Sequence, residues 1–305
     1  MKIKSFFGKK NKDNVTHKLE TKITYPIGKY KILLDHHHNI DNYQKKYPLY
    51  DRFLPHFCSL LSGLIIDIGA NIGDTSIAIF SQNDDCFIVG VEPDGDFFNE
   101  YVENMKLNNL ENRSLGIQKF VSTKNGSFII EKDETASTGS ISLSTDGSDA
   151  ANTINFDGLS TEISSKTSKD FDLLKIDTDG FDWDIINSFC ASENDHLKDP
   201  RFIFFEMQTF LNNDETKTLQ RDEMKNNYTE ALKRLQQKGY THFSLLDNFG
   251  TFVLTTDKID EIIAMNEYVI RSQVHNKYST IYYFDVLAYQ EKEQEFVKNS
   301  ISNFY

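Results

Sequence analysis

The 305-residue sequence lacks the features that mark several large classes of protein. It has three cysteines, Cys58, Cys86 and Cys190, which are widely separated and show no paired spacing. Such a set suits neither a disulfide framework nor a zinc site, so we expect reduced thiols. No apolar run approaches the roughly 20 residues that span a bilayer, and we find no secretory hydrophobic segment. These absences predict a soluble, cytoplasmic protein without a transmembrane segment.

Positive charge is scarce over most of the chain, which carries a formal net charge of −13. A protein that binds duplex nucleic acid must neutralise phosphates with Lys and Arg, so we exclude nucleic acid as a partner. The first 31 residues differ, because they hold nine Lys against Asp13 and Glu20 and carry a net charge of +7. We expect this basic arm to be a solvated tail, and weak contact with an acidic membrane surface is the alternative.

Apolar residues are plentiful enough for a core, at 39% of the chain, with 13% aromatic residues. Strand-like and helix-like segments alternate, which is typical of a parallel, doubly wound α/β sheet. The expected strands cover residues 64–68, 86–91, 117–121, 126–131, 171–177, 201–207 and 279–289. The expected helices cover about residues 74–81, 96–107, 182–190, 215–238 and 291–304.

The sequence predicts three parts. Residues 1–60 form an N-terminal basic arm and cap, residues 61–256 form the core, and residues 257–305 form a C-terminal extension packed on the core. The core sheet ends in an antiparallel hairpin made by "THFSLL" and "GTFVLTT". One insertion interrupts it at residues 135–168, where 15 of 34 residues are Ser or Thr. A long loop of this kind is expected to be a mobile lid or a solvated loop.

The segment "LIIDIGANIGDTS", Leu64 to Ser76, combines a buried strand, a glycine loop and the start of a helix. In open α/β sheets, ligands bind at such loops. A dinucleotide would need G-x-G-x-x-G, but the second and third glycines are absent after Gly69, and no G-K-[ST] of a Walker loop follows. The carboxylates of Asp67, Asp74 and Glu92 would also repel a diphosphate.

A cofactor with positive charge suits these carboxylates better. S-adenosylmethionine carries a sulfonium, an ammonium group and a ribose diol. Asp67 ends the first strand and could receive the ammonium group. Glu92 ends the second strand in "VGVEP" and could accept both ribose hydroxyls. The alternative is that Asp67 and Asp74 only cap the helix and that Glu92 is a surface turn residue.

Three segments in this order, "IDIGANIGDTS", "VGVEPD" and "FDLLKIDTDGFDWDII", resemble the motifs of the FkbM-type family of S-adenosylmethionine-dependent methyltransferases. The resemblance covers roughly residues 60–210 and implies a class I methyltransferase (Rossmann-like) fold. It also implies methylation of a hydroxyl on a sugar or natural product. Carried over position by position, it assigns cofactor binding to Asp67, Gly69, Asn71, Gly73 and Glu92. Asp74 and Thr75, which we expect to cap the following helix, join this cofactor-binding set. The third motif is matched by Lys175, Asp177 and Gly180, whereas Asp179 stands where the family more often has Glu.

The acceptor side requires a group that removes a proton, because an alcohol is a poor nucleophile near neutral pH. Asp177 and Asp179 in "KIDTDG" and Glu206 in "FFEMQ" follow or end strands, and they are the candidate catalytic residues. Converging carboxylates repel unless one is protonated or a cation lies between them. We expect a general base rather than Mg²⁺ or Mn²⁺, because no third ligand is fixed by sequence and Asp179 is shorter than Glu.

Several other polar and aromatic residues have simpler explanations. The acidic "DTDGFDWD" lacks the Gly and Glu of an EF-hand, so Asp182 and Asp184 are expected to be first-turn acids that the helix dipole favours. We expect His36–His38 to be exposed histidines rather than a metal site, with a role at the acceptor as the alternative. Packing of the cap is expected of Tyr43, Tyr47 and Tyr50, with a sugar site as the alternative.

The sequence therefore predicts an S-adenosylmethionine-dependent O-methyltransferase that acts on a hydroxyl of a carbohydrate or related natural product. The runner-up is a non-catalytic S-adenosylmethionine-binding or scaffold protein of the same fold. A nucleotide-dependent oxidoreductase is a third, weaker alternative.

Overall fold

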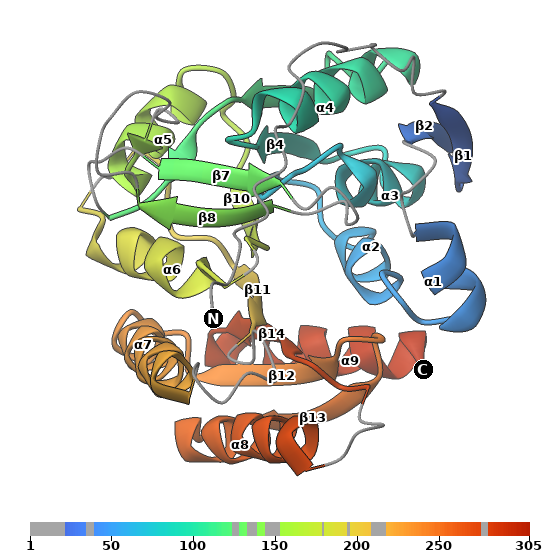
Figure 1. Ribbon diagram of the computed structural model, residues 1–305. Helices are drawn as coiled ribbons and strands as arrows, with labels where there is room; N and C mark the ends of the chain where they lie inside the picture. Colours follow the sequence, from blue (N-terminus) through green and yellow to red (C-terminus); the bar gives the residue numbers. More distant parts are fainter. Residues whose placement is uncertain are drawn as a thin grey trace, which may run out of the picture.

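The computed structural model describes residues 22–34, 40–123, 128–132, 139–143, 153–178, 180–193, 196–208, 218–275 and 280–305. Its centre is an eight-stranded sheet in the order β13-β12-β14-β11-β10-β3-β4-β5 (Figure 1). In chain order the strands are β3 (Leu64–Ile68), β4 (Phe87–Val91), β5 (Ser114–Ile117), β10 (Phe171–Ile176), β11 (Phe202–Met207), β12 (His242–Asp247), β13 (Phe252–Thr256) and β14 (Phe284–Tyr289). Strands β5, β4, β3, β10 and β11 run parallel, and β12 pairs with β13 as an antiparallel hairpin. The predicted doubly wound α/β sheet with a closing hairpin is confirmed.

Helices cover both faces of this sheet, because the strand side chains that point to each face are apolar. In β3, Leu64, Ile66 and Ile68 join one hydrophobic cluster and Ile65 joins the other. The first cluster is completed by α5 (Phe156–Ser164), α6 (Asp182–Ala191), α7 (Thr218–Gln237) and α8 (Ile259–His275). The second is completed by α1 (Ile40–Lys46), α2 (Phe53–Cys58), α3 (Asp74–Gln82), α4 (Gly95–Leu107) and α9 (Gln294–Phe304). Figure 1 shows the two sets, with α5 and α6 on one side and α2 and α3 on the other.

The N-terminal part of the described chain forms a small hairpin and two short helices. Strands β1 (Ile23–Ile27) and β2 (Tyr30–Leu34) pair antiparallel and pack beside α3 and α4. Asn104 of α4 holds β2 in place, because its side-chain oxygen accepts from the Leu33 amide at 2.7 Å and its amide donates to the Leu33 carbonyl at 3.3 Å. Residues 1–21 of the basic arm and His36–His38 lie outside the described residues.

The last 49 residues, which we expected to pack on the core as an extension, also contribute to the sheet. Strand β14 lies between β11 and β12 and is antiparallel to both. Its sequence "FDVLAY" is buried at five of six positions, as a central strand requires. Glu206 of β11 is thereby placed opposite Asp285 of β14.

The insertion at residues 135–168 holds more regular structure than its Ser and Thr content indicates. Strands β8 (Gly139–Leu143) and β9 (Thr153–Ile154) lie inside it. They pair with two strands that precede it, β8 with β7 (Phe128–Lys132) and β9 with β6 (Phe120–Val121). Helix α5 then buries Phe156, Leu159 and Ile163 against the sheet. The expectation of a continuous loop was wrong at α5, because three apolar residues on one helix face outweigh the hydroxyl residues between them.

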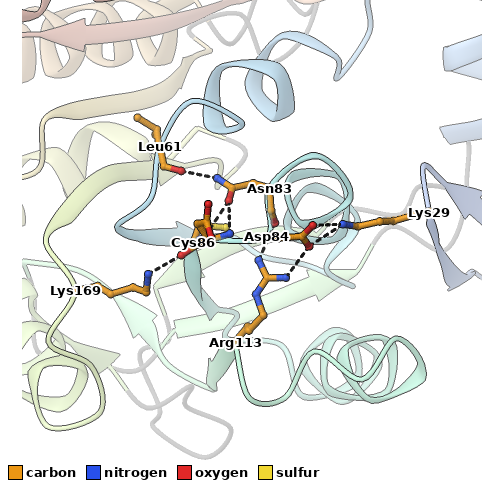
Figure 2. Close-up of polar contacts among 8 residues, drawn as sticks. Lys29, Leu61, Asn83, Asp84, Cys86, Arg113 and Lys169 are labelled. Atoms are coloured by element: carbon orange, nitrogen blue, oxygen red, sulfur yellow. Dashed lines mark hydrogen bonds and ion pairs between the residues drawn. The ribbon is translucent and has the colours of Figure 1, made fainter.

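Figure 2 shows the polar contacts around Asn83, the residue that follows α3. Its amide group donates to the carbonyls of Cys58 and Leu61 at 2.6 and 2.7 Å. Its oxygen accepts from the backbone amides of Asp85 and Cys86 at 2.7 and 3.0 Å. One buried side chain therefore joins the end of α2, the end of α3 and the approach to β4.

An exposed set of charges surrounds this junction. Asp84 pairs with Lys29 at 2.7 Å and with Arg113 at 3.3 Å (Figure 2). Water and salt screen exposed pairs of this kind, so we expect Asn83 to contribute more to the stability of the junction than they do.

None of the described helices is long and apolar enough to cross a membrane. Cys58, Cys86 and Cys190 are all free.

Replacing Asn83 with Ala should lower the free energy of unfolding by about 2–4 kcal/mol, because two carbonyls and two amides lose their buried partner. Urea denaturation of the purified protein measures this change. The exposed Asn112 gives a matched control, since Asn112→Ala should change stability by no more than about 0.5 kcal/mol. Equal stabilities for the two variants would contradict the role given to Asn83.

Candidate functional site

The glycine loop between β3 and α3 lies against the ends of two neighbouring strands. The backbone amides of Gly69 and Ala70 donate to the Val91 carbonyl, at the end of β4, at 2.9 and 3.1 Å. Gly69 has φ of 78°, and a Cβ at this position would lie 1.8 Å from the Asp177 carbonyl oxygen after β10. No side chain fits there, so glycine is required for the loop to cross between the two strand ends.

Below the loop lies a buried ion network. Asp67 has no exposed surface; its carboxylate lies 2.9 Å from the Lys175 ammonium and accepts from the Ser76 hydroxyl at 2.7 Å. The Lys175 ammonium also lies 3.3 Å from the Asp177 carboxylate. Burial disfavours the charge on Lys175, but the two carboxylates outweigh it and hold the pKa of the ammonium group above its usual range. Asp67 therefore holds a lysine in this structure.

Glu92 faces the loop from the end of β4. Its two carboxylate oxygens accept from the backbone amides of Asn71 and Asp94, each at 2.9 Å. Only 6% of its surface is exposed, and burial raises the pKa of Glu92 to about 7, against the opposing effect of the two amides. Glu92 is thus a fixed carboxylate that titrates near neutral pH.

A hollow with about 570 Å³ of empty space, here called the loop cleft, opens beside Glu92. Gly69, Asn71 and Glu92 form one wall, and Asp177 and Thr178 lie at another side. The remaining lining residues are Ile68, Pro93, Asp94, Phe97, Lys119, Phe120, Val121 and Ile185. Apolar and aromatic side chains thus surround a few polar groups, as is usual in small-molecule sites.

A second hollow, here called the large cavity, holds about 1460 Å³ of empty space and adjoins the loop cleft. Gly69, Asn71 and Asp177 line both hollows. The N-terminal helices supply one wall, which includes Tyr50. Five carboxylate residues line the large cavity: Asp51, Asp74, Asp177, Glu206 and Asp285.

These carboxylates come from five separate segments, and both burial and repulsion act on Asp285. Burial raises the pKa of Asp285 well above its usual range, and the negative charges of Asp177 and Asp51 add to the effect. Lys175 opposes it, but its ammonium group already pairs with Asp67 and Asp177. The large cavity is therefore a strongly acidic space.

The predicted cofactor residues divide between these two hollows. Asn71 and Glu92 line the loop cleft, whereas Asp74 and Thr75 line only the large cavity. Asp74 and Thr75 do not cap α3 as expected, because the helix begins at Asp74 and Gly73 occupies the N-cap position with φ of 89°. Gly73 packs on the side chains of Met105 and Tyr101.

The predicted catalytic residues are placed as follows. Asp177 follows β10 with a half-exposed side chain, and Glu206 near the end of β11 is buried; both line the large cavity. Asp179 lies outside the described residues.

Asp182 and Asp184 make hydrogen bonds that their interpretation as first-turn acids did not predict. Asp182 is fully buried; its carboxylate accepts from the amide and hydroxyl of Thr178 at 3.1 and 2.8 Å and from the Glu206 amide at 2.9 Å. It therefore ties the segment after β10 to the end of β11. Burial raises the pKa of Asp182 to about 7. Asp184 accepts from the hydroxyls of Ser122 and Thr123, both at 2.6 Å, and so fixes the chain beyond Val121 in the loop cleft.

Sequence reasoning missed other lining residues, and Asp285 is the most important of them. Its position depends on the insertion of β14 beside β11, which no local pattern announces. Asp94 could have been found, since it is a typical N-cap that accepts from the amides of Asp96 and Phe97.

Within the described ranges, no group of three or more His, Cys, Asp or Glu side chains is arranged to hold a metal ion. The carboxylates of the large cavity line a wide space without converging on one point.

Comparison with known proteins places this geometry in context. A family model described as "Methyltransferase FkbM domain" matches residues 67–242, which is more than half of the chain. No curated protein matches the chain by sequence. A solved structure of TYW2 from M. jannaschii in complex with AdoMet is 13% identical, with a TM-score of 0.41 over 93% of this chain and 88% of that chain.

Two further solved structures show similar likeness. The O-methyltransferase from Bacillus cereus in complex with SAH is 12% identical, with a TM-score of 0.40 over 82% of this chain and 87% of that chain. Precorrin-6y C5,15-methyltransferase from Geobacter metallireducens is 12% identical, with a TM-score of 0.37 over 78% of this chain and 85% of that chain. Likeness at this level carries no argument about chemistry, so the family match is the finding on which assignment rests.

Binding of S-adenosylhomocysteine should depend on pH through Glu92. An ionised carboxylate accepts hydrogen bonds at both oxygens, so affinity should rise as the pH passes through the Glu92 pKa of about 7. Ionisation of one such group gives a gain of about tenfold between pH 6 and pH 8. Calorimetric titration across this range measures it.

In Glu92→Gln the pH dependence should disappear, and affinity at pH 8 should fall by about ten- to a hundredfold. Glu111→Gln, at an exposed glutamate, is the matched control and should keep the wild-type profile. A wild-type affinity that is flat from pH 6 to pH 8 would rule out Glu92 as the titrating group.

Proposed function

Because the chain belongs to the FkbM methyltransferase family, we propose that it transfers a methyl group from S-adenosylmethionine to a hydroxyl of a carbohydrate or related natural product. The observation that carries this proposal is the junction of the loop cleft with the large cavity at Gly69, Asn71 and Asp177. A cofactor in one hollow and an acceptor in the other would meet at this junction.

The residues of the loop cleft fit S-adenosylmethionine. Gly69 and Asn71 line this cleft, and Glu92 presents a carboxylate that suits a ribose diol. When bound, the cofactor supplies an electrophilic methyl group on a positively charged sulfur. Gly69, Asn71 and Glu92 would bind it. Asp67 would act through Lys175, whose ammonium group donates to the Gly69 carbonyl at 3.3 Å and so holds the loop.

The large cavity fits a molecule with many hydroxyls. Carboxylates and amide side chains are the usual acceptors and donors for such groups, and Gln44, Asn248 and Gln208 line the cavity beside the acids. Among the carboxylates, Asp177 is the one that lines both hollows. Asp177 would accept the acceptor's hydroxyl proton, and Glu206 would orient the acceptor from the neighbouring strand end.

A non-catalytic binding protein of the same fold remains the second candidate, and turnover separates it from an enzyme. A nucleotide-dependent oxidoreductase is the third, and ligand preference separates it. Titrations with S-adenosylhomocysteine and with NAD should show binding of the former alone. Binding of NAD alone would end the methyltransferase proposal. From the three free thiols we further infer a reducing, cytoplasmic setting.

Replacing Asp177 with Asn should leave affinity for S-adenosylhomocysteine within about threefold of wild type while turnover falls. Loss of a positioned general base costs on the order of 10²–10⁴ in rate. Radiolabelled methyl transfer to a glycan acceptor measures turnover, and calorimetry measures affinity. Asp222→Asn, at an exposed position on α7, is the matched control and should retain full activity.

Two outcomes would change this mechanism. Full turnover in both Asp177→Asn and Glu206→Gln would remove these strand ends from proton transfer. Activity that EDTA abolishes and Mg²⁺ restores would replace the general base with a metal ion.

A further inference from the structure

Four aromatic side chains, here called the aromatic rim, form one continuous cluster: Tyr43, Tyr47, Tyr50 and Phe249. The rings of Tyr47 and Phe249 stack with centroids 4.0 Å apart. Tyr43 lies 5.2 Å from Tyr50 and 6.4 Å from Tyr47, again measured between centroids. The cluster joins α1 and the segment after it to the turn between β12 and β13, far along the chain.

The aromatic rim borders the large cavity. Tyr50 itself lines the cavity, and so do Gln44, Asn248 and Gly250, which are chain neighbours of Tyr43 and Phe249. The two segments are fixed against each other, because a Cβ on Gly250 would lie 2.4 Å from the Leu49 carbonyl oxygen. The rim is therefore continuous with the cavity wall through Tyr50.

Packing of the cap explains the stacked rings of Tyr47 and Phe249, but it does not explain why Tyr43 is exposed. Tyr43 is 43% exposed although two other rings, those of Tyr47 and Tyr50, lie beside it. A tyrosine ring supported by other rings and open to solvent presents a flat apolar face with a polar tip. Such a face matches the apolar face of a sugar ring.

The charges inside the large cavity limit which sugars can enter it. Five carboxylates line it, and its lysine, Lys175, already pairs with Asp67 and Asp177. A uronic, sialic or phosphorylated sugar would bring a further negative charge beside these carboxylates. At the rim there is a positive charge instead, because the Lys46 ammonium group lies 5.0 Å from the centroid of the Tyr47 ring.

We propose that Tyr43, supported by Tyr47, Tyr50 and Phe249, is a stacking subsite for a second sugar ring at the mouth of the large cavity. The acceptor is then the end of a neutral or amino-bearing oligosaccharide. Its terminal sugar enters the acidic cavity, and the next sugar lies on Tyr43. This inference rests on the proposed function, in which the terminal sugar binds in the large cavity.

The first experiment measures binding of the fluorescently labelled full chain, saturated with S-adenosylhomocysteine, to an array of saccharides. The array carries neutral, amino and acidic sugars, each as a monosaccharide and as an oligosaccharide. Neutral or amino oligosaccharides should bind, and acidic ones should not. A preference for acidic saccharides would overturn the proposal.

The second experiment titrates the best oligosaccharide of the array, and its terminal monosaccharide, against three variants. Tyr43→Ala should weaken oligosaccharide binding by about five- to tenfold, the size expected for one lost aromatic contact. It should leave monosaccharide binding unchanged, and Tyr43→Phe should restore the oligosaccharide affinity. Tyr268→Ala removes a tyrosine that is 57% exposed on α8 and should have no effect.

The outcomes separate this inference from the proposed function. If saccharides bind but affinity does not rise with chain length, or if Tyr43→Ala equals wild type, the stacking subsite is wrong and the carbohydrate activity stands. If no saccharide binds, the carbohydrate acceptor itself is wrong, and the subsite fails with it.

Discussion

The ammonium group of Lys175 connects the parts of the site to one another. Lys175 lies opposite Asp67 in the register of β10 and β3, so the ion pair forms where two central parallel strands meet. The same group reaches Asp177 and the Gly69 carbonyl. Removing one partner of a buried ion pair costs about 3–5 kcal/mol, because the other charge is left without compensation. The loop, the strand ends and the wall between the two hollows therefore depend on this contact.

The ion network also gives the two hollows different characters. On one side, the loop cleft holds Glu92 among apolar and aromatic residues, and the backbone amides of Asn71 and Asp94 fix its orientation. On the other side, the large cavity gathers acids from the cap and from the sheet. In the proposed function the cofactor would lie in the loop cleft and the hydroxyl-bearing acceptor in the large cavity. Asp177, which lines both hollows, would then lie where the transfer takes place.

Local patterns predicted the elements that follow directly from neighbouring residues. The apolar run of β3, the glycine loop and Glu92 after β4 are each visible within a few neighbouring residues. The order of such segments along the chain predicted the parallel sheet. Helix α5 could have been predicted from Phe156, Leu159 and Ile163, but the abundance of Ser and Thr around them concealed the pattern.

Residues whose roles depend on distant strands could not be predicted. Asp285 became part of the site because β14 inserts beside β11 and faces Glu206, a pairing of segments far apart in the chain. Asp182 was expected to be a first-turn acid of its helix, yet its carboxylate accepts a hydrogen bond from the Glu206 amide in the neighbouring strand. Asp67 was expected to face a ligand, and the structure instead pairs it with a lysine that strand register brings opposite. In each case the partner is supplied by the tertiary fold.

The most direct test of the account is transfer of labelled methyl from S-adenosylmethionine to glycan fractions of the source cell by the full-length protein. Label should appear in a glycan fraction, survive alkaline hydrolysis and be released by acid as an O-methyl sugar. A methyl ester on a carboxylate would be lost in alkali, whereas an ether is stable. Label that appears only in alkali-sensitive esters, in protein or in nucleic acid would contradict it.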